Sequence, residues 1–425
     1  TLVVCPLTIM RTVWADSLWS MAPVGTALLR GSRDERLRAL RDGDPHYLLI
    51  NYEGLAILEP ELRAMVASGE IANVVIDEFT AYGNAQSARW KAADRVINGP
   101  AGERRGDRGW MPAPTAARRV WALSGTPSAD VVGAFGYARL VNPRQLLYRS
   151  LTSWRHATTD KWGPEPWQYR PRPEAQDIVH RTLQPCVRHV KEEVLPFLPA
   201  VRVETVRVGL SAEQLEAHGR LRAAGRALLA GGGEIKANNK AILMQKLFQV
   251  SLGHVRAQDG RVARLDAGPR LEVLGRLVES TPRKTVIFGA YVNVNAALAD
   301  WLRARGHSAE RVDSSVTGAR RDAIFGDFQK ERDPRALVVH PRTTAYGTEL
   351  AVADKIIFNG PMLSGLHVYL QAIERLSSAK QTAAEVRIYC VFGTREEEAF
   401  QGRLNGLARW ADCVADSFNI LVRED

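Results

Sequence analysis

The feature that most constrains the fold of this chain is a regular alternation of short apolar runs with longer amphipathic stretches. The short runs are rich in Val, Ile and Leu, which is typical of buried strands, whereas the longer stretches repeat apolar residues at helical spacing. In the first third of the chain, the predicted strands lie at residues 2–5, 26–29, 47–51, 73–76 and 120–123. The predicted helices between them lie at residues 10–20, 33–41, 59–67 and 85–96. This alternation predicts βαβ units around a buried parallel sheet.

A second alternation of the same kind begins after residue 268. Its predicted strands lie at residues 285–288, 311–313, 336–340, 355–358 and 386–391. The segment before it is rich in Pro and Trp and then carries two helical stretches. We therefore predict an α/β protein with two lobes built on parallel sheets and a helical segment between them. The predicted boundaries are 1–145 for the first lobe, 146–268 for the connecting region and 269–425 for the second lobe.

Composition narrows the class of protein without indicating a function. The 425 residues are 45% hydrophobic and 24% charged, which excludes a disordered acidic chain, a collagen-like repeat and a small disulfide scaffold. No apolar stretch approaches the ~20 residues that cross a bilayer, so we expect no membrane partner. The four cysteines form no CxxC pair, which favours a reducing, cytoplasmic location.

The charge balance is positive. Lys and Arg number 57 against 47 Asp and Glu, which gives a net charge of +10. A positive field favours polyanions, and the planar fork of arginine suits phosphate groups. Because arginine enrichment also follows from a GC-rich genome, the charge alone does not decide whether the partner is nucleic acid.

The strongest local signal is an acidic pair, Asp77 and Glu78, directly after a predicted strand. This position is the carboxyl edge of a parallel sheet, where open α/β sheets bind ligands. Asp can hold Mg²⁺ through water, and Glu can orient or deprotonate a water that attacks a phosphoanhydride. Taken alone, a solvated acidic turn is the commoner explanation. A later strand ends in a Ser-Gly-Thr-Pro turn at residues 124–127, and the two features together are much rarer than either one.

Several segments, taken in order along the chain, resemble the motifs of superfamily 2 helicases, and within them of bacteriophage-like Swi/Snf-type DNA translocases. In the first lobe the matching segments are Val4-Cys5-Pro6-Leu7-Thr8 with Trp14 (motif Ia), Leu49-Ile50-Asn51-Tyr52-Glu53 (motif Ib), Asp77-Glu78-Phe79-Thr80 (Walker B) and Leu123-Ser124-Gly125-Thr126-Pro127 (motif III). In the second lobe they are Lys284-Thr285-Val286-Ile287-Phe288 (motif IV), residues 338–350 (motif V) and Tyr369-Leu370-Gln371-Ala372-Ile373-Glu374-Arg375 (motif VI). The order and spacing of these matches make the resemblance specific.

The resemblance implies two RecA-like lobes that close on ATP and move along DNA through sequence-independent backbone contacts. It implies ATP and Mg²⁺ as cofactors and a bacterial cell or a phage-infected host as the location. The catalytic residues it implies are Asp77, which would hold Mg²⁺ through water, Glu78, Gln371 and Arg375. The residues implied to couple nucleotide state to DNA are Ser124, Gly125 and Thr126. Those implied to face the DNA backbone are Pro6, Thr8, Tyr52 and Thr343.

The departures from the family pattern concern the elements that face ATP. The sequence contains no Gly-Lys dipeptide and therefore no GxxxxGK[ST] loop, which in the family lies shortly before motif Ia. We expect such a loop either before Thr1 or not at all. Ser378 stands where the second motif VI arginine is expected, Lys380 replaces a glycine, and Glu349 replaces the usual asparagine.

Three hypotheses remain open at this stage. The first is an ATP-dependent DNA translocase or helicase. The second is a degenerate helicase fold that serves as a DNA-binding or assembly module without ATPase activity, and the altered motifs favour it. The third, a nucleotide-binding α/β protein unrelated to DNA, requires the ordered motif series to be accidental. Two charged stretches, residues 30–41 and 395–409, are most simply solvated helix faces.

Overall fold

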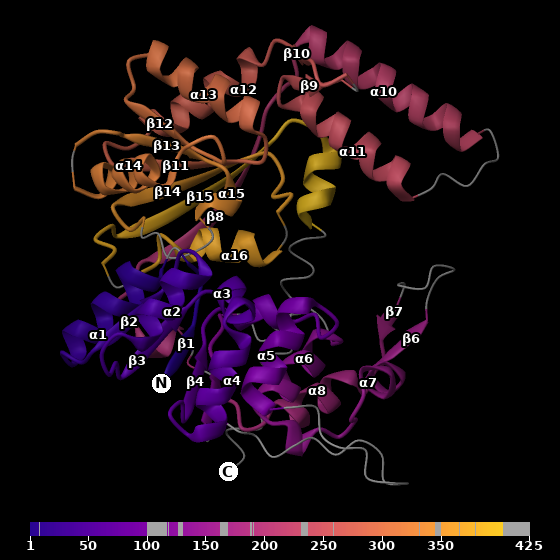
Figure 1. Cartoon of the computed structure of the whole chain (residues 1–425). Helices are drawn as coiled ribbons and strands as arrows, with labels where there is room; N and C mark the ends of the chain where they lie inside the picture. Colours follow the sequence, from indigo (N-terminus) through magenta and orange to yellow (C-terminus); the bar gives the residue numbers. More distant parts are fainter. Residues whose placement is uncertain are drawn as a thin grey trace. The chain divides into compact units, whose positions relative to one another are not determined.

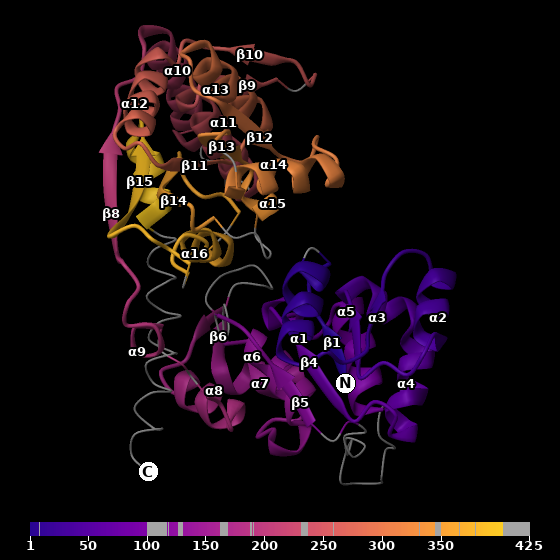
Figure 2. The same ribbon diagram turned by 90° about the vertical axis from the view of Figure 1, so that its left-hand side faces the viewer.

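The computed structural model shows two compact units, one containing Thr1–His189 and the other Val190–Ala408. The residues it describes are 1–7, 9–99, 117, 119–125, 131–161, 169–187, 189, 191–230, 237–257, 259–330, 332–344, 350–364, 366–378 and 380–402. Each unit is described by itself below. Figure 1 and Figure 2 show the first in indigo to magenta and the second mostly in pink, orange and yellow.

The first unit is built on a five-stranded parallel sheet. Its strands, in spatial order, are β2 (Thr26–Leu29), β3 (Tyr47–Ile50), β1 (Leu2–Val4), β4 (Asn73–Ile76) and β5 (Arg119–Ala122). Each strand is only three or four residues long, and β1 is buried along its whole length because it pairs with β3 on one side and β4 on the other. All five carboxyl ends therefore meet at one edge of the sheet.

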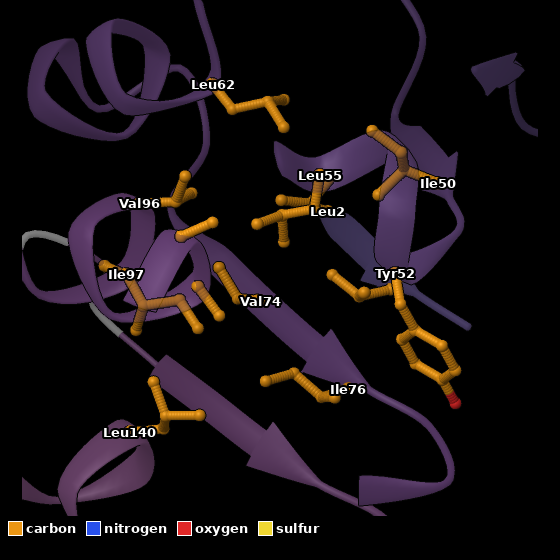
Figure 3. Packing of buried hydrophobic residues seen from close by; sticks show 14 of the residues in the cluster. Leu2, Ile50, Tyr52, Leu55, Leu62, Val74, Ile76, Val96, Ile97 and Leu140 are labelled. Atoms are coloured by element: carbon orange, nitrogen blue, oxygen red, sulfur yellow. The ribbon is translucent and has the colours of Figure 1, made fainter. Parts of the chain in front are cut away.

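Helices cover this sheet through their apolar faces. The helical segments are the π-helix η1 (Met10–Ala15), α1 (Asp16–Met21), α2 (Arg33–Arg41), α3 (Tyr52–Ile57), α4 (Glu59–Ser68), the 3-10 helix η2 (Phe79–Tyr82), α5 (Ala88–Asn98) and α6 (Gly133–Val141). Alternate strand residues and helix residues form one core, part of which Figure 3 shows. In that view Tyr52 stands at the margin of the aliphatic side chains, with its hydroxyl directed away from them.

A smaller helical layer extends the first unit. It contains η4 (Pro143–Gln145), α7 (Leu151–Thr158), α8 (Ala175–Leu183) and the antiparallel pair β6 (Thr159–Lys161) and β7 (Tyr169–Pro171). Trp154 is fully buried in its core, and its indole N–H donates to the carbonyl of Val131 at 2.8 Å. This tryptophan is therefore a packing residue.

The second unit is built on a six-stranded parallel sheet. Its strands, in spatial order, are β12 (Ala309–Val312), β13 (Ala336–Val339), β11 (Lys284–Gly289), β14 (Ala353–Asn359), β15 (Glu385–Phe392) and β8 (Ala200–Arg207). The strand β8, which was not predicted from the sequence, pairs with β15 along all eight residues. The second sheet thus takes an edge strand from residues that were assigned to the connecting region.

Both faces of the second sheet are covered. The helices of this unit are α9 (Lys191–Val194), α10 (Ala212–Ala230), α11 (Ala237–Ser251), α12 (Gly268–Glu279), α13 (Val292–Ala304), α14 (Gly318–Lys330), α15 (Pro341–Thr344) and α16 (Leu366–Glu374). One core joins α12 and α13 to one face of the sheet, and a second core joins α14 and α16 to the opposite face. A short antiparallel pair, β9 (His254–Arg256) and β10 (Val262–Arg264), follows α11.

The predicted fold class is confirmed: the chain is an α/β protein with two units, each built on a parallel sheet. The two charged stretches predicted to be solvated helix faces are exposed or half-buried at most of their described charged residues, but each contains one buried charge. Arg36 is 6% exposed, because its guanidinium donates to the carbonyl of Gly31 at 2.9 Å and to the side chain of Asn51 at 3.0 Å. Glu397 is fully buried, because it pairs with Arg270. No helix in the described part of the chain combines the length and the apolar character needed to span a bilayer.

Candidate functional site

The acidic pair forms a tight turn at the carboxyl edge of the first sheet. The backbone N–H of Asp77 donates to the carbonyl of Val4 at 2.8 Å, and that of Phe79 donates to the carbonyl of Leu123 at 3.0 Å. Glu78 between them has φ 49° and ψ 56°, the left-handed region that side-chain-bearing residues seldom adopt. Such strained residues cluster at functional sites, where the surrounding structure holds them in place.

Neutral donors hold the carboxylate of Asp77. The indole N–H of Trp14 donates to Oδ2 at 2.8 Å, and the backbone N–H of Glu78 donates to Oδ1 at 2.9 Å. Among the residues that the structure describes, Asp77 forms no ion pair. Because a carboxylate offers about four lone-pair positions, two hydrogen bonds leave room for further ligands.

The negative charge of Asp77 contributes to the raised pKa of Cys5, which follows β1. The thiol of Cys5 is fully buried, and burial, with a smaller contribution from the charge of Asp77, raises its pKa to about 12. A thiol with such a pKa stays protonated at neutral pH, so Cys5 is a packing residue and not a nucleophile.

The next strand end lies beside the acidic turn. Ile76 and Ala122 are register partners in β4 and β5, so Ser124 follows β5 at the same sheet edge as Asp77. Ser124 and Gly125 are both exposed there. Thr126, the third predicted coupling residue, lies outside the described residues.

A cluster of aromatic side chains packs beside the acidic turn and hydrogen-bonds to it. The hydroxyl of Tyr52 donates to the carbonyl of Asp77 at 2.8 Å, and its ring meets that of Tyr82 edge-on with centroids 5.6 Å apart. Phe79 in turn packs on Tyr137 with centroids 4.7 Å apart. The guanidinium of Arg89 lies 5.2 Å from the ring centroid of Tyr52. The turn therefore rests on packed rings that hold it rigid.

The predicted DNA-facing residues of the first unit are mostly buried. Tyr52 is 6% exposed, Pro6 is also buried, and Thr8 lies outside the described residues. The hydroxyl of Tyr52, which a phosphate contact would need, is already bonded to Asp77. The structure thus gives Tyr52 a positioning role, and its contact with DNA stays a prediction.

The predicted residues of the second unit lie at the matching edge of its own sheet and on α16. Both polar atoms of the Gln371 side chain are buried, and neither has a hydrogen-bond partner among the described residues. Arg375 is half-buried just after α16, and its carbonyl accepts from the backbone N–H of Leu350 at 3.3 Å. Thr343 donates its hydroxyl to the carbonyl of His340 at 2.6 Å.

Gln381, close to the two altered motif VI positions, has a local structural role. Its side-chain amide N–H groups donate to the backbone carbonyls of Ala353 and Leu376, and its side-chain oxygen accepts from the backbone N–H of Ala383 at 2.9 Å. Ser378 is half-buried and Lys380 is exposed. Glu349 lies outside the described residues.

The structure therefore brings together three groups of predicted residues in the first unit: the end of β1, the acidic turn after β4 and the turn after β5. Sequence reasoning placed Trp14 in motif Ia but did not predict its contact with Asp77, which lies 63 positions further along the chain. One signal was available, because an indole N–H in a half-buried position needs an acceptor. Its partner could not be named without the fold.

The residues present fit a hydrated divalent cation. Mg²⁺ prefers oxygen ligands and keeps several waters, and Asp77 offers a carboxylate that is oriented yet not neutralised by a cationic side chain among the described residues. The exposed hydroxyl of Ser124 adds a second oxygen at the same edge. The described residues of this unit include no glycine-rich loop for a triphosphate.

Comparison with curated proteins gives sequence relatives over most of the chain. A SWI/SNF-related matrix-associated actin-dependent regulator of chromatin subfamily A-like protein 1 from Xenopus tropicalis is 24% identical over 391 residues, which are 90% of this chain and 37% of that protein. A chromodomain-helicase-DNA-binding protein 1-like from Danio rerio is 23% identical over 84% of this chain and 33% of its own length. The chain thus spans about a third of these relatives, which support a helicase fold of the Swi2/Snf2 type.

No protein-family model matches the chain. Among solved structures, the SWI2/SNF2 ATPase core of Sulfolobus solfataricus in complex with dsDNA is 17% identical, with a TM-score of 0.37, over 98% of this chain and 85% of that one. The C-terminal part of the Fun30 ATPase domain is 15% identical, with a TM-score of 0.40, over 52% of this chain and 99% of that one. Because these scores are low, the fold is assigned from the two parallel sheets of this chain and not from these structures.

Proposed function

We propose that this chain is the core of an ATP-dependent DNA translocase of the Swi/Snf kind. The single observation that carries the proposal is the Asp77 carboxylate, which neutral donors hold at the carboxyl edge of a parallel sheet. Burying part of a charge without a cationic partner costs free energy, so such an arrangement is retained where the charge has a use. The similarity of the sequence to Swi2/Snf2-type proteins suggests the use of this charge, which is to hold a cation for ATP hydrolysis.

Within this proposal the residues of the chain have separate tasks. Asp77 orients the cation through water, and Glu78 accepts a proton from the attacking water at its carboxylate. Bound Mg²⁺ would screen the negative charge of the phosphates. Gln371 and Arg375 of the second unit stay predicted contacts of the nucleotide, and Ser124, Gly125 and Thr126 stay the residues predicted to couple its state to the DNA.

The positive net charge of +10 supports backbone-dominated, sequence-independent DNA binding. Pro6, Thr8 and Thr343 stay predicted contacts of the DNA backbone. A cytoplasmic location and a bacteriophage-like origin are part of the same proposal.

A second candidate function is a DNA-binding or assembly module without hydrolysis. Ser378 in place of the second motif VI arginine favours it, because loss of an arginine finger costs about 10³-fold or more in phosphoryl transfer. Lys380 supplies a positive charge but not the bidentate fork of arginine. The two functions differ in one measurable quantity, the rate of ATP hydrolysis.

The test is DNA-stimulated ATPase activity of the full chain and of its Glu78→Gln variant. We expect the variant to lose hydrolysis by about 10²-fold or more, the usual contribution of a general base, and to keep its DNA affinity. The matched control is Glu70→Gln, because Glu70 is exposed at the opposite end of β4. Equal turnover by the wild type and Glu78→Gln would defeat the role of Glu78. If the wild type hydrolysed ATP no faster than an Arg375→Ala variant, the result would favour the DNA-binding or assembly module without hydrolysis.

A further inference from the structure

We propose that Trp14 is a positioning residue that fixes the Asp77 carboxylate and couples it to the segment between β1 and α1. The inference rests on the proposed function, because the cation site that Trp14 would serve is the one assigned there. It concerns a residue whose side chain touches neither nucleotide nor DNA in that proposal and acts through Asp77.

The two oxygens of the carboxylate are held from different directions. Oδ1 accepts from the backbone N–H of Glu78, inside the turn itself, and Oδ2 accepts from the Trp14 indole, 63 residues earlier in the sequence. Among the described residues, Trp14 supplies the only side-chain donor to this carboxylate. Without it, rotation of the Asp77 side chain would be limited by a single local bond.

The chemistry of the donor suits this task. An indole N–H is neutral and donates only, so it orients a carboxylate without neutralising its charge. A Lys or Arg in the same place would pair with Asp77 and compete with a metal ion for it. The Trp14 bond therefore combines a fixed geometry with a charge that stays available.

The segment that carries Trp14 has a buried base and an exposed tip. Ile9 and Met10 are 6% and 2% exposed, and the backbone N–H groups of Val13 and Trp14 both donate to the carbonyl of Ile9 at 3.1 Å. This sharing of one carbonyl is part of the π-helix η1, a form that is frequent at functional sites. Leu7, which precedes η1, is 56% exposed, and Val13 within η1 is 39% exposed.

A ligand that contacts the exposed side chains of Leu7 and Val13 would thus act on a segment that is bonded directly to Asp77. The sequence resemblance puts a DNA contact in this segment. We infer that binding at the segment and cation binding at the acidic turn influence each other through Trp14, since a shift of η1 changes the bond to Oδ2. The coupling is reciprocal by thermodynamic necessity.

The experiment compares Trp14→Phe with Trp19→Phe in the full chain. Phenylalanine keeps an aromatic ring but lacks the N–H, and Trp19 is the matched control because it is 67% exposed in the neighbouring helix α1. Three quantities are measured: the Mg²⁺ concentration that half-saturates ADP binding, the affinity for duplex DNA, and the thermal midpoint. We expect Trp14→Phe to raise the Mg²⁺ concentration roughly five- to tenfold, as loss of one hydrogen bond allows, with DNA affinity and midpoint close to wild type.

Two results would overturn the proposal. One is a Trp14→Phe variant that matches Trp19→Phe in its Mg²⁺ requirement. The other is a parallel loss of Mg²⁺ binding, DNA affinity and thermal midpoint, which would indicate a structural role alone. If DNA lowers the Mg²⁺ requirement of the wild type, Trp14→Phe is expected to lose that effect.

A second measurement separates this proposal from the proposed function. In protein labelled with ¹⁵N-tryptophan, the Trp14 indole resonance is the one that disappears in Trp14→Phe. It is expected to shift in Asp77→Asn, because the acceptor loses its charge. If the wild type bound no Mg²⁺–ADP, the proposed function would fail, and this resonance alone would decide the position of Trp14. A resonance unmoved by Asp77→Asn would disprove the bond.

Discussion

The two parallel sheets carry acidic side chains near the same edge, but they use those charges in opposite ways. In the first unit, Asp77 is held by neutral donors and forms no ion pair among the described residues. In the second unit, the fully buried side chain of Asp313 follows β12 and lies 3.2 Å from the guanidinium of Arg311. Glu397, after β15, pairs with Arg270 at 3.0 Å.

The difference separates charges that stabilise the fold from a charge that serves a site. Arg270 also donates to Ser251 at 2.8 Å, to Asn359 at 3.2 Å and to the carbonyl of Val391 at 3.1 Å, so it ties several elements of the second unit together. A buried ion pair of this kind satisfies its own charges and leaves none for a ligand. Of the three carboxylates compared, Asp77, which forms no ion pair within the described residues, is the one available to a cation.

The largest expected effect is a loss of stability on removing the buried ion pair between Arg270 and Glu397 in the second unit. Arg270→Ala should destabilise the chain by about 3–5 kcal/mol, because it leaves Glu397 buried and without its cationic partner. Urea unfolding of the full chain measures the loss. The matched control is Arg207→Ala, which removes an exposed pair with Glu398, the residue after Glu397, and should leave the midpoint nearly unchanged. Equal effects of the two variants would contradict the distinction between them.

A smaller effect concerns a buried cation of the second unit. Burial lowers the pKa of Lys355 to about 8, and its ammonium donates to the hydroxyl of Ser280 at 2.7 Å. Because the unfolded chain holds this proton up to about pH 10.5, it binds more protons than the folded chain between about pH 8 and 10.5. The contribution of Lys355 to the free energy of unfolding therefore rises with pH across this window, by roughly 1 kcal/mol per pH unit at most. Below about pH 8 this contribution does not change with pH.

Lys355→Met removes this titration. The measurement is the free energy of unfolding of wild type and variant at pH 7, 8, 9 and 10, and the quantity that matters is the difference between the two curves. We expect that difference to shift in favour of the wild type as the pH rises from 8 to 10. Parallel curves would show that Lys355 keeps an ordinary pKa in the folded chain.

Periodicity and strand-end chemistry were enough to predict most of the fold. The apolar run before Asp77 is short and β-branched, so its strand and the position of the acidic pair followed from local sequence. The strand β8 was missed because its residues are exposed along almost the whole strand and lack the apolar signature of a buried one. A strand at a sheet edge is defined by its partner more than by its own composition.

The site was predictable only in part, for a related reason. Residue types at strand ends indicate which carboxylates meet, but long-range donors are set by packing. Trp14 and Tyr52 reach Asp77 from 63 and 25 positions away, and neither spacing has a local signature. Likewise, Arg36 and Glu397 lie in stretches whose charge predicts a solvated surface, and only the fold shows the partners that allow their burial.

The smallest effect decides between two roles for Tyr52. If the residue positions the acidic turn, Tyr52→Phe loses the bond from its hydroxyl to the Asp77 carbonyl and costs about 1 kcal/mol of stability, while DNA affinity stays the same. If its hydroxyl contacts the DNA backbone, as the sequence resemblance implies, DNA affinity falls and stability changes little. Urea unfolding and duplex DNA titration of one variant therefore give opposite patterns for the two roles. The ring contact with Tyr82 survives in phenylalanine, so any change reports on the hydroxyl alone.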